Sequence, residues 1–399
     1  MTGSAAGEKV GHGGPAGACR DPLDGAAETA AFGRALLDWY DAHGRDLPWR
    51  QTRDPYRIWI SEVMLQQTRV GQMEAFYTRF LDRFPTLADL AAAADAEVLK
   101  AWEGLGYYAR ARQLHGAARQ VMADHGGALP TTRDGLLALP GVGPYTAAAV
   151  SSIAFDRDHV VLDGNVSRVL CRLLLVTDLP TRQSVRQRLI EAGERLLVRG
   201  RAGDFNQALM ELGARVCLPA APRCDGCPVG LWCRVRAAGA DPTAVPQRRP
   251  RRPGPHLQVT AGMIWRGDRL LLAQRPAGGM LGGLWEFPGG KQEPGETLEA
   301  CLRREIREEL GLNITVGPEV ASVDHAYTHF RITLHAFSAW SGRGTPRTLA
   351  CAAWQWVAPA DLGAFAMPRS DRRIIEYLVA QQGGVHPPVR PPSRHRGGH

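Results

Sequence analysis

Apolar residues follow two different rhythms along the chain. From Thr29 to about Arg236 they recur at helical spacing between short breaks that contain Gly and Pro, with few alternating runs of β-branched residues. This half is expected to be all-α. Further on, the pattern predicts one long helix and four strands, over Leu298–Leu310 and over Gln258–Ile264, Leu270–Ala273, Arg331–Trp340 and Ala353–Val357. The fold class is therefore multidomain, an all-α domain followed by an α+β domain.

A chain of 399 residues is too long for one ordinary core and fits two domains with tails. The stretch DPTAVPQRRPRRPGPH is rich in Pro and Arg, lacks apolar periodicity and is expected to be an extended basic linker. We expect five segments: a disordered tail over residues 1–28, a helical domain over 29–240, the basic linker over 241–256, the α+β domain over 257–380 and a disordered basic tail over 381–399.

The composition is that of a globular protein, with 44% hydrophobic and 22% charged residues. No uninterrupted apolar stretch approaches the length of a membrane span, and the first thirty residues lack the patterns of a signal or transit peptide. We therefore expect a soluble, cytoplasmic protein with no membrane partner. The net charge of +8 favours a polyanionic partner, because Lys and Arg set against phosphates release condensed counterions.

Four of the eight cysteines are closely spaced, as C-x6-C-x2-C-x5-C over residues 217–233. Without an export signal, such thiols are expected to be ligands or free thiols rather than disulfides. Four thiolates in so short a loop can surround a [4Fe–4S] cube. Structural zinc sites usually pair two short C-x2-4-C elements, and only one is present here, so iron–sulfur is favoured over zinc. The expected ligands are Cys217, Cys224, Cys227 and Cys233.

A glycine-containing turn and an aspartate form the most informative pair of features in the helical half. In LPGVGPYTAAA, Gly141 and Gly143 permit a tight turn and Pro144 suits the first position of a helix, whose free N–H groups can meet a phosphate. Alone, the turn fits an ordinary helix–helix connection. About twenty residues on, Asp163 lies in VLDGNVSRVL. The combination resembles the helix-hairpin-helix DNA glycosylases, whose family places a catalytic aspartate there.

The residue after Pro144 narrows the resemblance. Bifunctional members of that superfamily carry a lysine nucleophile where this chain has Tyr145, so no amine is present to form a Schiff base. The sequence therefore predicts base excision without lysine-driven strand cleavage. Across about residues 36–234 the chain is similar to the adenine DNA glycosylases, the MutY family, through the stretches DLPWR (46–50), WISEVMLQQT (59–68), GLGYYAR (104–110) and FNQALMELG (205–213).

The resemblance implies excision of adenine mispaired with 8-oxoguanine or guanine in double-stranded DNA, by a monomer associated with the nucleoid. Adenine is a poor leaving group, so a proton donor to the base and an anion beside the sugar are both needed. Glu62 lies among apolar residues, where desolvation is expected to raise its pKa and keep it protonated as the acid. Asp163 is expected to stay ionised and to stabilise the oxocarbenium carbon, roles that the family also assigns.

Other site residues follow from the resemblance alone. Tyr145 and Asn165 are expected to form hydrogen bonds near the sugar and Asp163. The adenine pocket is expected to be lined by Trp49, Arg50 and Glu211. Because the base must be flipped out of the stack, residues are needed to fill the gap, and the family places Gln67 and Tyr107 there.

The second half carries its own motif, FPGGKQEPGETLEACLRREIREELGL, which satisfies the Nudix pattern. On a helix, Glu305, Glu308 and Glu309 gather on one face, where they could bind Mg²⁺ and activate water against a pyrophosphate. A charged amphipathic helix is the simpler alternative. Adenine DNA glycosylases typically end in a Nudix-like domain that reads 8-oxoguanine but has lost these carboxylates, which this chain keeps. Its HAYTH stretch resembles the family's F-S-H reader element, which implies lesion contacts by Thr328 and His329.

Three hypotheses follow. The leading one is a monofunctional adenine glycosylase with a lesion-reading domain. The second is a dual-function fusion that also hydrolyses 8-oxo-dGTP with Mg²⁺, since the Nudix stretch equally resembles the hydrolases that destroy this nucleotide. The third, a lesion-binding module without a working glycosylase centre, conflicts with the presence of Glu62 and Asp163.

Overall fold

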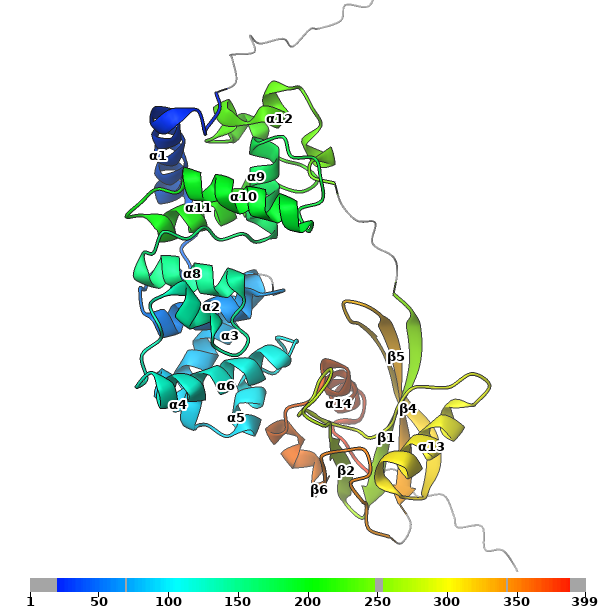
Figure 1. Cartoon of the computed structure of the whole chain (residues 1–399). Helices are drawn as coiled ribbons and strands as arrows, with labels where there is room; N and C mark the ends of the chain where they lie inside the picture. Colours follow the sequence, from blue (N-terminus) through cyan, green and yellow to red (C-terminus); the bar gives the residue numbers. More distant parts are fainter. Residues whose placement is uncertain (1–19, 69, 248–253, 342–343, 388–399) are drawn as a thin grey trace, which may run out of the picture. The chain divides into compact units, whose positions relative to one another are not determined.

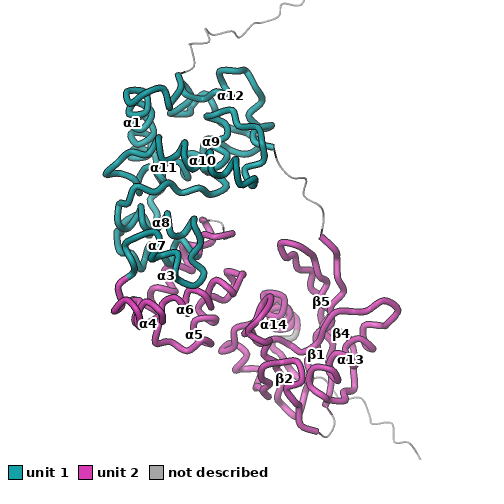
Figure 2. Tube along the Cα trace, in the orientation of Figure 1, with its two compact units in different colours: residues 1–63, 129–250 teal, residues 64–128, 251–399 magenta. Residues whose placement is uncertain are grey.

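The computed structural model describes residues 20–68, 70–247, 254–341 and 344–387. The chain forms two compact units, one of residues 1–63 and 129–250, the other of residues 64–128 and 251–399 (Figure 2). We call them unit 1 and unit 2. The chain crosses between them inside helix α2 (Pro55–Leu65) and returns after helix α6 (Ala109–Asp124). The expected helical domain is therefore shared between the two units.

Unit 1 is helical (Figure 1). Beside the first part of α2 it contains α1 (Gly25–His43), α7 (Arg133–Leu137), α8 (Pro144–Phe155), α9 (Gly164–Leu173), α10 (Gln183–Leu196), α11 (Ala202–Arg215) and α12 (Arg234–Ala237). Four short 3₁₀ turns lie between them: η1 (Pro48–Arg50), η2 (Cys224–Gly226), η3 (Gly230–Trp232) and η4 (Pro242–Ala244). Helices α1, α9, α10 and α11 bury their apolar faces in one core that includes Phe32, Leu170, Leu189 and Phe205.

Three boundaries differ from the sequence-based expectation, and one of them is the start of the C-terminal tail expected at residue 381, since the last helix runs to Gln382 and Val385 is buried in a core. Helix α1 begins at Gly25, inside the segment expected to be a tail to residue 28. The first residues of the expected linker also pack on unit 1, because Val245 is buried and the Gln247 N–H donates to the carbonyl of Thr177 at 2.9 Å. The rest of the linker up to residue 253, and the tails over residues 1–19 and 388–399, lie outside the described residues.

Unit 2 contains a small helical part and a sheet. The helices are α3 (Val70–Arg83), α4 (Leu87–Ala92), α5 (Asp95–Ala101) and α6. The sheet is built from β1 (His256–Arg266), β2 (Arg269–Gln274), β3 (Trp285–Glu286), β4 (Ile314–Ala326), β5 (Arg331–Ser341) and β6 (Ala353–Val357). Its order is β3-β2-β1-β5-β4, with β6 also paired to β2. Strands β1 and β5 run parallel, and the other pairs are antiparallel.

Two helices cover the sheet on opposite faces. Helix α13 (Leu298–Leu310) buries Leu302, Ile306 and Leu310 against residues of β1, β2 and β5. Helix α14 (Arg369–Gln382), which follows the 3₁₀ turn η5 (Pro359–Ala364), joins a second apolar cluster on the other face. The four expected strands lie within β1, β2, β5 and β6, and the expected helix has the bounds of α13. The expected fold class is confirmed. None of the described helices is long and apolar enough to cross a membrane.

Candidate functional site

Glu62 and Tyr145 form the buried centre of the site in unit 1. Glu62 lies on α2 between apolar neighbours and is only 4% exposed. The Tyr145 hydroxyl, at the second position of α8, donates to Oε2 of Glu62 at 2.7 Å. Burial raises the pKa of Glu62 to about 7, although the hydrogen bond from Tyr145 opposes the shift. Glu62 can therefore hold a proton near neutral pH, as the sequence predicts.

Asp163 is held at the N-terminus of α9. It is the N-cap residue, and its Oδ1 accepts the backbone N–H of Val166 at 2.6 Å. Its Oδ2 accepts from the side-chain amide of Asn165 at 3.1 Å. Burial raises the pKa of Asp163, while these hydrogen bonds work against the rise. The negative charge of Asp163 also helps to raise the pKa of Glu62, so the two carboxyl groups act on each other across the site.

Asp163 has one of its two expected hydrogen-bond partners. Asn165 bonds to it as expected, whereas the Tyr145 hydroxyl donates to Glu62 instead. A cleft of about 640 Å³ borders Asp163 and has Arg168, Thr181 and Arg186 in its wall. The aspartate is thus partly enclosed but reachable from a basic opening.

Arg168 fixes Asn165. Its guanidinium donates to the side-chain oxygen of Asn165 at 2.9 Å, to the carbonyl of Gly213 at 2.8 Å and to the carbonyl of Cys217 at 2.8 Å. Helix α11 approaches α9 closely at this point, since a Cβ placed on Gly213 would lie 2.6 Å from Cβ of Asn165. Packing between two helices and one arginine therefore sets the position of the residue that orients Asp163.

A buried ion-pair cluster lies between the first 3₁₀ turn and α11. Glu211 is fully buried and accepts from Arg45, at 2.7 Å on each carboxylate oxygen, and from Arg50 at 2.9 Å. Burial alone would raise the pKa of Glu211, but its hydrogen bonds and charge interactions with the two arginines hold it below the usual value. Trp49 is buried beside Arg50. Arg45 was not among the expected site residues, because it pairs with a residue 166 positions away.

The glycine turn has the expected form. Gly141 adopts a positive φ of 73°, which glycine tolerates without strain, and Gly143 is the N-cap of α8 with Pro144 in the first turn. The turn leads directly into the first turn of α8, which contains Tyr145. Backbone N–H groups at such a terminus suit a phosphate oxygen.

The two expected wedge residues lie in unit 2 and share an uncommon backbone. Gln67 and Tyr107 have φ values of 62° and 49°, in the left-handed region that non-glycine residues rarely adopt. Both side chains are exposed. The hydroxyl of Tyr107 contacts the hydroxyl of Thr328, one of the two expected reader residues. One expected wedge residue and one expected reader residue are therefore in contact within unit 2.

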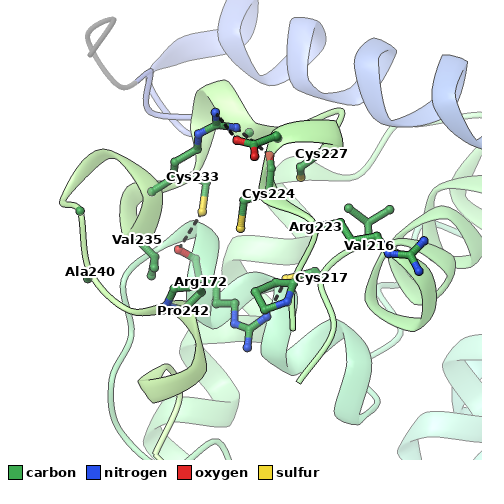
Figure 3. Close-up of a pocket in the computed structure, with 15 residues that line it drawn as sticks. Arg172, Val216, Cys217, Arg223, Cys224, Cys227, Cys233, Val235, Ala240 and Pro242 are labelled. Atoms are coloured by element: carbon green, nitrogen blue, oxygen red, sulfur yellow. Dashed lines mark hydrogen bonds and ion pairs between the residues drawn. The ribbon is translucent and has the colours of Figure 1, made fainter. Parts of the chain in front are cut away.

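The four expected cysteine ligands line one cavity of about 300 Å³ in unit 1 (Figure 3). Every cysteine in the described part of the chain is a free thiol. Arg172 is buried in the cavity wall and donates to Sγ of Cys217 at 3.3 Å and to the carbonyl of Leu218 at 2.7 Å. Four thiols spread around a cavity of this size, with a guanidinium beside them, suit an anionic polynuclear cluster.

Carboxylates on α13 and just before it accept hydrogen bonds from one arginine. Arg304 donates to Glu296 at 2.6 Å, to Glu305 at 3.0 Å and to Glu308 at 3.2 Å. Burial raises the pKa of Glu309 to about 7, and the neighbouring charge of Glu305 adds to the shift. Over the described residues, no three His, Cys, Asp or Glu side chains form a group that could hold a single metal ion. The expected convergence on Mg²⁺ is not found in this arrangement.

Comparison with known proteins finds two matching families. The model of the HhH-GPD superfamily of base excision DNA repair proteins matches residues 60–195, and the NUDIX domain model matches residues 260–377. The adenine DNA glycosylase of Homo sapiens is 36% identical over 415 residues, which cover 90% of this chain and 76% of that protein. The enzyme of the same name from Mus musculus is 38% identical over 366 residues, 78% and 71% of the two chains.

Several solved structures are also similar. A thermostable thymine-DNA glycosylase is 34% identical, and the alignment covers 52% of this chain and 95% of that one with a TM-score of 0.47.

Proposed function

The chain belongs to the adenine DNA glycosylases, N-glycosylases of base excision repair, and we propose that it excises adenine mispaired with 8-oxoguanine or guanine from double-stranded DNA. The observation that carries the proposal is a pair of carboxyl groups in different environments, Glu62 buried beside Tyr145 and Asp163 half-buried at the edge of a cleft. Adenine release needs one carboxyl group as acid and one as anion, and environment can divide these roles.

Glu62 is the general acid in this mechanism. Because its pKa lies near 7, it carries a proton at neutral pH in a large share of molecules. The proton passes to a ring nitrogen of adenine, and the electrons of the N-glycosidic bond leave with the base. The hydroxyl of Tyr145 fixes the carboxyl group and stabilises the carboxylate that remains.

Asp163 is the anion that faces the sugar. The hydrogen bonds from Val166 and Asn165 favour its ionised form and fix its direction. Its charge stabilises the oxocarbenium carbon, or bonds to it transiently, until water adds. With a phenol at Tyr145 in place of an amine, no Schiff base forms, so the sugar–phosphate backbone is left intact.

The remaining residues bind the flipped base and the duplex. The ion-pair cluster of Arg45, Arg50 and Glu211, with Trp49, forms the polar and aromatic wall of the adenine pocket. Gln67 and Tyr107 fill the gap in the base stack. Their side chains are exposed and their backbone lies in the left-handed region, which suits residues that project into DNA. The net charge of +8 fits a polyanionic partner, and we propose that the enzyme acts as a cytoplasmic monomer on the DNA of the nucleoid.

The identity of the released base tests this function. In single-turnover reactions, duplexes carrying adenine opposite 8-oxoguanine or guanine are expected to release free adenine, with strand scission only after alkali. Release of uracil, thymine or 8-oxoguanine would assign the chain to another specificity. Strand scission before alkali would contradict the role given to Tyr145.

We also propose that Cys217, Cys224, Cys227 and Cys233 hold a [4Fe–4S] cluster, which would brace the loop between α11 and α12. Protein purified without oxygen is expected to contain about four iron and four sulfide per chain. Cys227→Ser should lower this content sharply. The matched control is Cys351→Ser, at a cysteine outside the cavity. Stoichiometric zinc in place of iron and sulfide would contradict the assignment.

A second candidate function is hydrolysis of 8-oxo-dGTP by the Nudix domain. It is favoured by the presence of Glu305, Glu308 and Glu309 on one helix, although Arg304 holds two of them in this structure. Phosphate or pyrophosphate release from 8-oxo-dGTP with Mg²⁺ tests it, with Glu308→Gln and Glu309→Gln as variants. Hydrolysis that both variants retain in full would reject the candidate, as would its absence in the unmodified chain.

A further inference from the structure

The hairpin tip between β4 and β5 presents the two expected reader residues. Four residues, Tyr327 to Phe330, connect the strands, and the Tyr327 N–H donates to the Phe330 carbonyl at 2.9 Å. Thr328 and His329 are exposed at the tip, while Tyr327 and Phe330 are half-buried with their ring centroids 4.9 Å apart. The packed rings of Tyr327 and Phe330 therefore support the exposed residues of the tip.

A chain of polar groups under the tip ends in a buried carboxyl group. Tyr327 packs against the apolar cluster to which α14 contributes, and Ser370, on the first turn of α14, lies close enough to the Tyr327 hydroxyl to oppose the rise that burial causes in the pKa of Tyr327. Ser370 and Asp371 are 3% and 4% exposed, and the serine hydroxyl donates to Oδ2 of Asp371 at 3.1 Å. Because a serine hydroxyl has one hydrogen, it can accept from Tyr327 while it donates to Asp371.

Asp371 is itself anchored in the sheet. Its Oδ1 accepts the backbone N–H of Phe287, directly after β3, at 3.0 Å. The two oxygens of Asp371 thus accept from two different elements, Oδ1 from the backbone after β3 and Oδ2 from Ser370 on α14. The relay Tyr327–Ser370–Asp371–Phe287 thus connects the reader tip to the rigid centre of the domain.

We propose that Ser370 and Asp371 are positioning residues that set the enzyme's preference for 8-oxoguanine by fixing Tyr327 and the tip that carries Thr328. The proposal rests on the proposed excision of adenine opposite 8-oxoguanine and on the lesion contacts that the resemblance implies for Thr328 and His329. Neither residue touches the lesion itself. A reader hydroxyl discriminates only when it is held within a fraction of an ångström of its partner, so loss of the anchor should cost selectivity rather than folding.

The neighbouring contacts indicate that the anchor acts on the tip alone. Arg373, also on α14, donates to the carbonyl of Asp324 and so holds the end of β4 independently. The ring of Tyr327 packs edge-on against His325 at 4.6 Å, a contact that phenylalanine would keep. Removing only the hydroxyl therefore leaves strand and ring packing in place, together with the contact between Thr328 and Tyr107, and loosens only the link between the tip and Ser370.

The test is the ratio of single-turnover adenine release opposite 8-oxoguanine to that opposite guanine. Tyr327→Phe and Ser370→Ala are each expected to lower this ratio roughly fivefold to tenfold, which is the effect of losing one hydrogen bond. The ratio should fall because adenine release opposite 8-oxoguanine slows while release opposite guanine does not. Because both variants break the same bond, the double variant should be no worse than either single one. Tyr377→Phe, on the same helix but 48% exposed, and Ser322→Ala, exposed on β4, are matched controls that should keep the ratio.

The outcomes separate the inference from the function on which it rests. If the unmodified enzyme shows no preference for 8-oxoguanine, lesion reading by this domain is wrong. If it shows the preference and Tyr327→Phe retains it, the positioning role is wrong, even where Ser370→Ala fails to fold. Additive effects of the two substitutions would also overturn the inference. A ratio that drops while release opposite guanine and the melting temperature stay unchanged supports it.

Discussion

The hydroxyl of Tyr145, at the second position of α8, donates to Glu62. This hydrogen bond opposes the effect of burial on the pKa of Glu62, so the acid is tuned by two contributions of opposite sign. At the residue scale, the proposed reaction therefore depends on the protonation of the Glu62 carboxyl group.

The pH dependence of adenine release follows from that pKa. Glu62 acts in its protonated form, so the single-turnover rate should fall as pH rises through about 7. Tyr145→Phe removes a bond that stabilises the carboxylate, which should raise the pKa of Glu62 and move this limb to higher pH. A limb that rises with pH, or a shift in the other direction, would remove Glu62 from the role of acid. Tyr377→Phe should leave the limb in place.

Some residues of the site could be predicted from the sequence and others could not. Glu62 lies in a local run of apolar residues, and Asp163 at a polar break between apolar runs, so their environments can be inferred from their neighbours. Arg45 and Ser370 carry no such local signal. Each acquires its role from a residue that is distant in the chain or from a turn on another element, which only the folded structure brings close.

At the scale of elements, the crossing of α9 and α11 positions Asn165 and, through it, Asp163. Gly213 lets α11 approach the first turn of α9, where a Cβ would come within 2.6 Å of the Cβ of Asn165. The packed interior cannot absorb such an overlap without a shift of backbone or rotamer. The geometry around Asp163 is thus sensitive to a residue that touches no substrate.

Gly213→Ala is expected to separate the two helices and displace Asn165 and Asp163. The free energy of unfolding should fall by about 1–3 kcal/mol, and single-turnover release should slow by roughly tenfold or more. Chemical denaturation and rapid-quench kinetics measure the two effects. Gly116→Ala in α6, where a Cβ meets open space, is the matched control and should stabilise the protein slightly. An unchanged rate in Gly213→Ala would show that the crossing does not set the active geometry.

Periodicity predicts elements well where one face is buried. Helix α13 has the expected bounds because its apolar residues recur along one stripe. Strand β4 was not expected, since Gly317 and Pro318 interrupt its sequence and the pairing with β5 shifts register there. Strand β3 has only two residues and is defined by its pairing with β2 rather than by a pattern of its own.

At the scale of the whole molecule, two family domains share one chain. The glycosylase match and the NUDIX match fall on separate segments, as the change of hydrophobic rhythm predicts. The division into compact units does not follow these segments, because residues 64–128 of the helical half belong to the same unit as the sheet. Sequence patterns report local elements, whereas compact units arise from contacts between distant segments, and this is why the two divisions differ.

The proposed function assigns adenine excision to Glu62 and Asp163. Single-turnover release from a duplex with adenine opposite 8-oxoguanine tests it most directly, with Glu62→Gln and Asp163→Asn compared at equal occupancy of the DNA. The unmodified enzyme should release adenine, and each variant should bind the duplex but react at least about a hundredfold more slowly. A variant that binds DNA and releases adenine at the unmodified rate would contradict the claim.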